Sequence, residues 1–231
     1  MRTIGLLGGM SWESTATYYR LINEGVRERL GGLHSAEMVL YSVDFEPVEQ
    51  LQTAGDWDGA GRLLARDARG VQAAGADLLV LCTNTMHKVA EAIEEAIDIP
   101  FLHIADATAE ALVRAGHQRV GLLGTAFTME QDFYKGRLVE RHGLEVLVPC
   151  DDDRRLVHDV IYDELCLGQV LDASRREYAR IIGALQQEGA EAVILGCTEI
   201  ALLLGGHDTA VPVFDTTAIH AAAAVDAALA D

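Results

Sequence analysis

Two stretches of the chain recur in the same order about half a chain later. Ile4–Gly8 (IGLLG) returns as Val120–Gly124 (VGLLG), 116 residues further on. Ala74–Leu81 (AGADLLVL) aligns without a gap to Glu188–Leu195 (EGAEAVIL), at an offset of 114. Any two strand-to-helix turns can look alike, but ordered matches at nearly equal offsets favour a duplicated half. The chain is therefore predicted to fold as two related lobes.

Each half alternates short β-rich runs with longer segments of helical period, which is typical of βα units around a parallel sheet. The fold class predicted is α/β, with two pseudo-symmetric lobes at residues 1–116 and 117–231. Each lobe is a four-stranded parallel sheet flanked by helices, the C-terminal helix can pack back on the first lobe, and the active site lies between the lobes. The expected strands are Ile4–Leu7, Met38–Val43, Leu78–Leu81, Phe101–Ile104, Val120–Leu123, Glu145–Val148, Ala192–Leu195 and Val213–Phe214.

Charge and cysteine content narrow the class of partner. The 231 residues include 18 basic and 36 acidic side chains, a net charge of −18, which disfavours nucleic acid and anionic membranes as partners. No stretch reaches the length of a membrane span or resembles a secretory signal. The four cysteines form no Cys-x-x-Cys pair and show no metal-ligand spacing with the histidines. They are expected to be reduced thiols in a cytoplasmic protein that holds no metal.

The repeat also aligns the residues that follow the third strand of each half. Carrying the offset of 114 past Leu81 and Leu195 pairs Thr83 with Cys197. Open parallel sheets bind ligands at the carboxyl ends of their strands. Thr83 and Cys197 are therefore expected to approach a cleft from opposite sides.

Several motifs at these positions resemble the aspartate/glutamate racemase superfamily. They are the Gly196-Cys197-Thr198-Glu199 turn, the Asn84-Thr85 turn, the opening segment Ile4–Trp12 and the segment Pro212–Thr216. The resemblance implies a homodimeric, cofactor-independent racemase whose substrate is a small amino acid. Two residues on opposite faces of that substrate would exchange its α-proton without pyridoxal phosphate or metal, because racemisation needs one group to remove the proton and another to return one.

The proposed catalytic pair departs from the usual pattern of the family on one side. A cysteine usually stands directly before Asn-Thr, where this chain has Thr83, and the cysteine here is Cys82. The chain is most similar to a subgroup that uses a threonine/cysteine pair, so Thr83 and Cys197 are the expected catalytic residues. Cys82 is either a packed thiol or a catalytic one. Cys197 follows a strand at a turn into a helix, where the helix N-terminus is expected to lower the pKa of its thiol.

Further residues are candidates for substrate binding. By resemblance, Met10 and Ser11 after the first strand, and Gln52 in the loop after the second, line the pocket. Four polar residues just after strands either hold the substrate α-carboxylate or cap helices: Asn84, Thr85, Thr125 and Thr198. Glu199 either receives the substrate ammonium or orients a thiol. Cys166 stands where the family often has a lysine that binds the side-chain carboxylate, so a strict preference for aspartate is not expected.

The leading interpretation is a racemase of aspartate, glutamate or a broader range of amino acids. The alternatives are a decarboxylase or cis-trans isomerase of the same superfamily, and a non-catalytic two-lobed protein that binds a small acid. Gly5–Ser11 does not satisfy Gly-x-Gly-x-x-Gly, so no dinucleotide cofactor is expected. His87 and His103 are expected to pack or to cap, although His87 lies one helical turn after Thr83.

Overall fold

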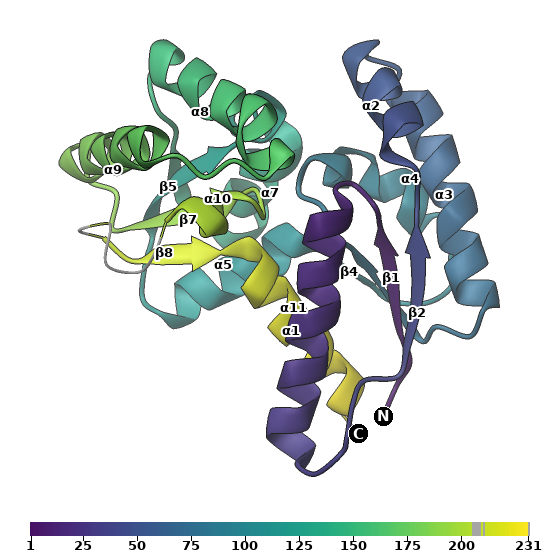
Figure 1. The fold of residues 1–231 in the computed structure, drawn as a ribbon. Coiled ribbons are helices and arrows are strands. Elements are labelled where there is room, and N and C mark those ends of the chain that lie inside the picture. Colours follow the sequence, from purple (N-terminus) through teal and green to yellow (C-terminus); the bar gives the residue numbers. More distant parts are fainter. Residues whose placement is uncertain (205–208, 210, 231) are drawn as a thin grey trace. The chain divides into compact units, whose positions relative to one another are not determined.

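A computed structural model describes residues 1–204, 209 and 211–230 (Figure 1). These residues form two four-stranded sheets in which every pairing is parallel, so the predicted α/β fold class is confirmed. The first sheet has the order β2-β1-β3-β4 and the second the order β6-β5-β7-β8. The strands are β1 (Ile4–Gly8), β2 (Met38–Ser42), β3 (Leu78–Leu81), β4 (Phe101–Leu102), β5 (Arg119–Gly124), β6 (Glu145–Leu147), β7 (Ala192–Gly196) and β8 (Val213–Asp215).

Helices connect the strands along the whole chain. The α-helices are α1 (Trp12–Leu30), α2 (Phe45–Thr53), α3 (Trp57–Ala73), α4 (Ala90–Glu94), α5 (Ile104–Arg114), α6 (Ala126–Glu130), α7 (Asp132–His142), α8 (Asp151–Asp163), α9 (Asp172–Gln187), α10 (Ile200–Leu203) and α11 (Thr216–Leu229). Two 3-10 helices are η1 (Thr85–Val89) and η2 (Leu165–Leu167). Within residues 1–204, 209 and 211–230, no helix is both long and apolar enough to cross a membrane.

The chain divides into two compact units. One consists of Met1–Ile104 together with His220–Asp231, and the other of Ala105–Ile219. The chain leaves the first unit after the fourth strand and returns to it within α11. The fourth strand was expected to extend to Ile104, but it ends at Leu102, because Ile104 already begins α5.

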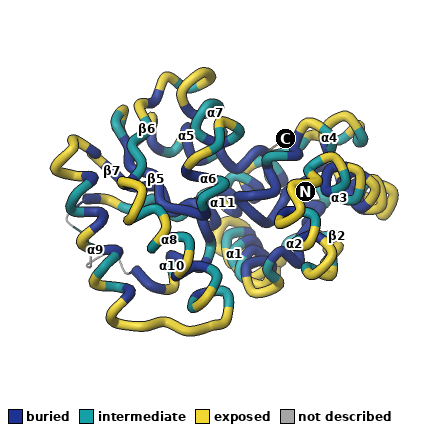
Figure 2. Tube along the Cα trace, turned by 90° about the horizontal axis from the view of Figure 1, so that it is seen from above, coloured by how far each residue is buried: buried dark blue, intermediate teal, exposed yellow. Residues whose placement is uncertain are grey.

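The first sheet is covered on both faces, because alternate side chains of a strand point to opposite sides. Leu7, Leu79 and Leu81 pack with residues of α2, α3 and η1 on one face. On the other face, residues of β1 and β3 pack with α1 and α11, whose contributing side chains are Tyr18, Ile22, Val26, Ala221, Ala224, Val225 and Ala228. The central strands are accordingly buried, whereas the outer faces of α3 and α9 are exposed (Figure 2).

The two sheets repeat one another in register as well as in strand order. Leu7 pairs with Leu81 in the first sheet, and Leu123 pairs with Leu195 in the second. The sequence offsets of 116 and 114 map Leu7 onto Leu123 and Leu81 onto Leu195, so equivalent residues are paired in the two sheets. Thr83 and Cys197 therefore occupy equivalent positions, each two residues beyond the aligned leucine.

Candidate active-site residues

The backbone at the carboxyl end of β3 is held by a dense set of hydrogen bonds. The amide of Cys82 donates to the carbonyl of Leu7 at 2.9 Å, and Ser14 Oγ donates to the carbonyl of Cys82 at 3.2 Å. The amide of Thr83 donates back to the carbonyl of Leu81 at 2.9 Å. These bonds tie the turn to β1 and to the first turn of α1, so the chain direction at Thr83 is closely defined.

Cys82 and Thr83 differ in surroundings although they are neighbours. The Cys82 side chain is fully buried in the core between the first sheet and α1, and burial raises the pKa of its thiol. Thr83 retains 9% exposure. Asn84 and Thr85 follow it, both buried, and η1 begins at Thr85. Three of the candidate residues thus form one continuous turn at the end of β3.

The turn after β1 supplies Met10 and Ser11. Gly9 has φ +95°, and a Cβ there would lie 2.3 Å from the carbonyl oxygen of Val43, so the turn requires glycine. Ser11 is the N-cap of α1, where its Oγ accepts from the amide of Ser14 at 3.2 Å. Met10 is buried in the core on the α2 and α3 side of the sheet.

Gln52 lies in a different element from the one expected. The prediction of a loop was wrong, because Gln52 belongs to α2, which Asp44 caps by accepting from the amide of Glu46. The Gln52 side chain is buried, and its Nε2 lies 2.7 Å from the Sδ of Met86 in η1. Gln52 is therefore joined to the segment that follows Thr83 rather than to the end of β2.

In the second unit, Thr125 and Cys197 follow neighbouring strands. Gly124 of β5 pairs with Gly196 of β7, so Thr125 and Cys197 are the next residues at the same edge of the sheet. Thr125 caps α6, because its Oγ1 accepts from the amide of Thr128 at 3.3 Å. Thr125 is thus a helix cap, one of the two roles expected for it, and it lies at the same sheet edge as Cys197.

Cys197 is bonded to a carboxylate two residues later. Its Sγ donates to Oε2 of Glu199 at 2.9 Å, and Oγ1 of Thr198 donates to the same oxygen at 2.6 Å. Both Cys197 and Glu199 are buried, at 9% and 7% exposure. Three consecutive residues of the GCTE motif therefore form one hydrogen-bonded group, and Glu199 faces the thiol.

This arrangement reverses the expected effect on the Cys197 thiol. Burial raises its pKa well above the usual value, and the neighbouring charge of Glu199 raises it further, with a smaller contribution from Cys166. The expectation of a lowered pKa was wrong because α10 has four residues and begins only at Ile200. Cys197 is consequently a protonated thiol at rest, with a proton acceptor already in contact.

Cys166 lies in η2 and is half-buried. It contributes to the raised pKa of both Cys197 and Tyr178, which places it in the same electrostatic environment. The Tyr178 hydroxyl donates to the carbonyl of Val157 at 2.9 Å. Cys166 brings no positive charge to this part of the second unit.

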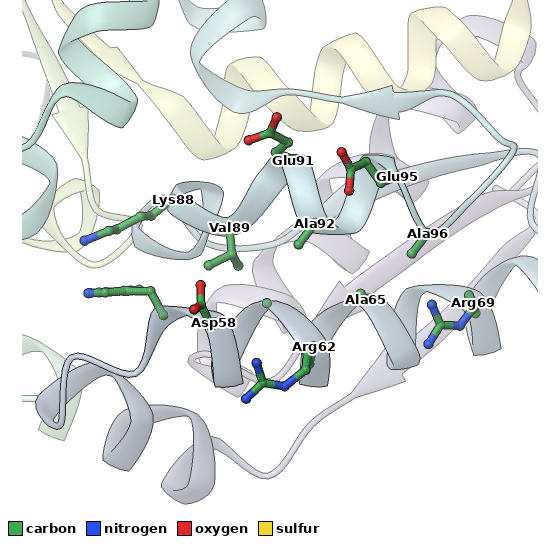
Figure 3. Close-up of a pocket in the computed structure, with 12 residues that line it drawn as sticks. Asp58, Arg62, Ala65, Arg69, Lys88, Val89, Glu91, Ala92, Glu95 and Ala96 are labelled. Carbon is green, nitrogen blue, oxygen red and sulfur yellow. The ribbon is translucent and has the colours of Figure 1, made fainter.

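A separate groove of about 700 Å³ lies between α3 and the η1–α4 segment of the first unit (Figure 3). Lys88 Nζ lies 3.9 Å from the centre of the Trp57 ring at one end. Arg62 and Arg69 line the α3 side, and Glu91 and Glu95 line the α4 side. The lining includes none of the predicted site residues, so this groove is distinct from the strand ends.

Across the described chain, no group of His, Cys, Asp or Glu has an arrangement that could hold a metal ion.

The duplicated sheets and the cysteine-carboxylate turn define a class of two-unit α/β proteins with polar side chains at the carboxyl ends of the strands. The family model described as Asp/Glu/Hydantoin racemase matches residues 7–224. The chain belongs to this family.

Individual relatives agree with that assignment. The crystal structure of a candidate Asp/Glu racemase from Yersinia pestis is similar to this chain, with 56% sequence identity and a TM-score of 0.94. The match covers 100% of both chains. The structure of an aspartate racemase homologue from Pyrococcus horikoshii OT3 is 35% identical, with a TM-score of 0.86 over 99% of both chains. The broad specificity amino-acid racemase RacX of Bacillus subtilis (strain 168) is 23% identical over 98% of each chain.

Proposed function

We propose that the protein is a cofactor-independent amino-acid racemase in which Thr83 and Cys197 are the two acid/base groups. The observation that carries the proposal is the repeated register, which gives these residues equivalent positions at the ends of β3 and β7. Membership of the racemase family supports the reaction class. In the proposal, each unit supplies one of the two groups that face the substrate Cα.

On the Cys197 side, the thiol first needs an acceptor for its own proton. Glu199 Oε2, 2.9 Å from Sγ, is that acceptor. The proton moves from Sγ to the carboxylate, and the thiolate then removes the α-proton from one face of the substrate. We therefore assign Glu199 to the thiol rather than to the substrate ammonium.

On the Thr83 side, the hydroxyl returns a proton to the opposite face of Cα. The resulting oxyanion regains a proton through solvent, and Glu199 loses the one it received, so the enzyme ends in its starting state. In the reverse direction the same two groups exchange roles. Asn84, Thr85, Thr125 and Thr198, all at strand ends, bind the α-carboxylate, with Met10, Ser11 and Gln52 lining the pocket.

The substrate range proposed is aspartate, glutamate and further amino acids. Two observations support a range wider than aspartate. Cys166 offers no positive charge to a side-chain carboxylate, and a broad-specificity racemase is among the relatives. We propose that the enzyme works as a cytoplasmic homodimer. Light scattering of the purified protein would test the dimeric state.

Incubation with single enantiomers tests the reaction. Purified protein, treated with a chelator and given no pyridoxal phosphate, is incubated with L- or D-aspartate, L- or D-glutamate and a set of neutral amino acids. Chiral chromatography should show the opposite enantiomer, and Cys197→Ser should not form it. Release of CO₂ would indicate a decarboxylase, and an altered double bond in an unsaturated diacid would indicate an isomerase. Binding without any turnover would leave only the binding protein.

A further inference from the structure

The carbonyl of Thr83 is held by a buried histidine. His87 Nδ1 lies 2.7 Å from the Thr83 carbonyl oxygen, and the amide of Ile104 donates to His87 Nε2 at 3.2 Å. His87 follows Thr83 by one helical turn, which allows its side chain to reach back to that carbonyl. One imidazole thus connects the end of β3 with the start of α5.

The two backbone partners fix the tautomer of His87. A carbonyl oxygen can only accept, so Nδ1 carries a hydrogen. A backbone amide can only donate, so Nε2 carries none. His87 is therefore a neutral imidazole with both ring nitrogens engaged by backbone groups, and neither nitrogen is available to react with a substrate.

Other rings pack around His87 and restrict its movement. His87 is 2% exposed, and its ring centre lies 4.5 Å from that of His103 and 5.5 Å from that of Phe101. The ring of His220 lies 5.9 Å away. The Tyr18 hydroxyl is hydrogen-bonded to Nδ1 of His220 at 2.8 Å, while Nε2 of His220 lies 2.8 Å from the carbonyl oxygen of Leu102. Rings from β4, from the residue before α5 and from α11 thus surround the imidazole.

We propose that His87 is a positioning residue that sets the direction of the Thr83 hydroxyl. This inference rests on the proposed function of Thr83. The amide of Thr83 and both backbone groups of Cys82 are already fixed, and His87 fixes the remaining carbonyl. A β-branched side chain has few χ1 rotamers, so fixing the backbone of threonine also limits where its hydroxyl points. Without His87, the buried carbonyl would have no imidazole donor, and the peptide plane could rotate.

Two substitutions of His87 separate the hydrogen bond from the packing. His87→Asn retains an amide nitrogen near the position of Nδ1, whereas His87→Leu fills part of the space without a donor. Tyr18→Phe is the matched control, because it removes another buried hydrogen bond of the same cluster without touching Thr83. Each variant is incubated in D₂O with each enantiomer separately, because only one of them presents its α-hydrogen to Cys197. Loss of the α-hydrogen is compared with formation of the opposite enantiomer.

Misplacing a reacting group by about 1 Å can slow a reaction on the order of 100-fold. His87→Leu should lose racemisation by about that factor, while deuterium still enters the unreacted substrate from the Cys197 face. The ratio of exchange to inversion should therefore rise in His87→Leu, return toward wild type in His87→Asn and stay unchanged in Tyr18→Phe. If the wild type is active and His87→Leu has the same ratio of exchange to inversion as the wild type, the positioning role is refuted but the proposed function is not. A wild type that racemises no amino acid refutes the proposed function.

The hydrogen bonds can also be tested in the wild-type protein, in case His87→Leu does not fold. In NMR spectra of protein labelled with ¹⁵N-histidine and with ¹³C at the threonine carbonyl, the His87 ring should show a hydrogen on Nδ1 and none on Nε2, with a coupling across the bond to the Thr83 carbonyl. A hydrogen on Nε2 would overturn the inference, whatever the activity of the variants.

Discussion

Replacing Cys82 with serine separates the two possible catalytic pairs. The Cys82 side chain is fully buried among apolar side chains of β1, β3, α1 and α11. Its Sγ has a long contact of 3.9 Å to the carbonyl oxygen of Val80. Cys82→Ser places a smaller and more polar group in that site, which should cost about 1 to 2 kcal/mol of unfolding free energy. For a chain of this size, each kcal/mol corresponds to about 2 to 4 °C in Tm.

Urea unfolding and calorimetry measure this loss, and chiral chromatography measures racemisation at a temperature where the variant is folded. We expect Cys82→Ser to keep most of its racemase activity, because its side chain packs in the core rather than at the turn surface. Cys150→Ser is the control: Cys150 is exposed and is the N-cap of α8, where serine is a good cap, so the variant should lose neither stability nor activity. A folded but inactive Cys82→Ser, together with normal racemisation by Thr83→Ala, would refute the register argument. Cys82 with Cys197 would then be the catalytic pair.

Three further perturbations test the proposed roles. Glu199→Gln removes the charge that helps to raise the pKa of the Cys197 thiol, so alkylation of that thiol should begin at lower pH. The same variant loses the proton acceptor, so racemisation should fall about 10² to 10⁴-fold. Thr83→Ala should abolish racemisation but retain slow exchange of the substrate α-hydrogen in D₂O, whereas Thr83→Cys should keep or raise activity. Burial opposes ionisation of Asp106, but hydrogen bonds from Arg137 and His142 outweigh it and hold the pKa of Asp106 below its usual value. Its stabilising effect should therefore be full above about pH 4 and be lost as the pH falls further, and Asp106→Asn should flatten the measured dependence of Tm on pH in that range.

Much of the fold could be predicted because its signals are local. The apolar runs around Leu6, Leu79 and Ile194 are short and bounded by polar residues or glycine, and the structure has a strand at each. The repeat of the sequence also predicted that the two halves are equivalent, and the structure pairs Leu7 with Leu81 as it pairs Leu123 with Leu195. The end of β4 was misplaced because Ile104 is apolar and β-branched in either state, and only its position at the start of α5 decides between them.

The candidate site was less accessible to sequence reasoning, since its properties depend on what surrounds each side chain. The motif identified Cys197 and Glu199, but the direction of the thiol pKa depends on burial and on a contact at 2.9 Å. The prediction of a loop at Gln52 was wrong because Asp44 caps a helix, α2, that contains Gln52. For His87, the spacing of four residues from Thr83 was the available signal. Its second partner, Ile104, is distant in sequence and could not be inferred.

The return of the chain to its first unit has a consequence for the order of folding. Residues of α11 complete the core on one face of the first sheet, and the amide of Arg2 donates to the carbonyl of Ala228 at 2.8 Å. A ribosome must therefore synthesise all of residues 105–219 before it makes the segment that completes the unit begun at β1. The second unit is continuous in sequence, so its synthesis is complete before that of the first unit. Although the two halves share an ancestral pattern, the half that is translated later can reach its native state earlier, while the first waits with one apolar sheet face covered by α1 but not by α11.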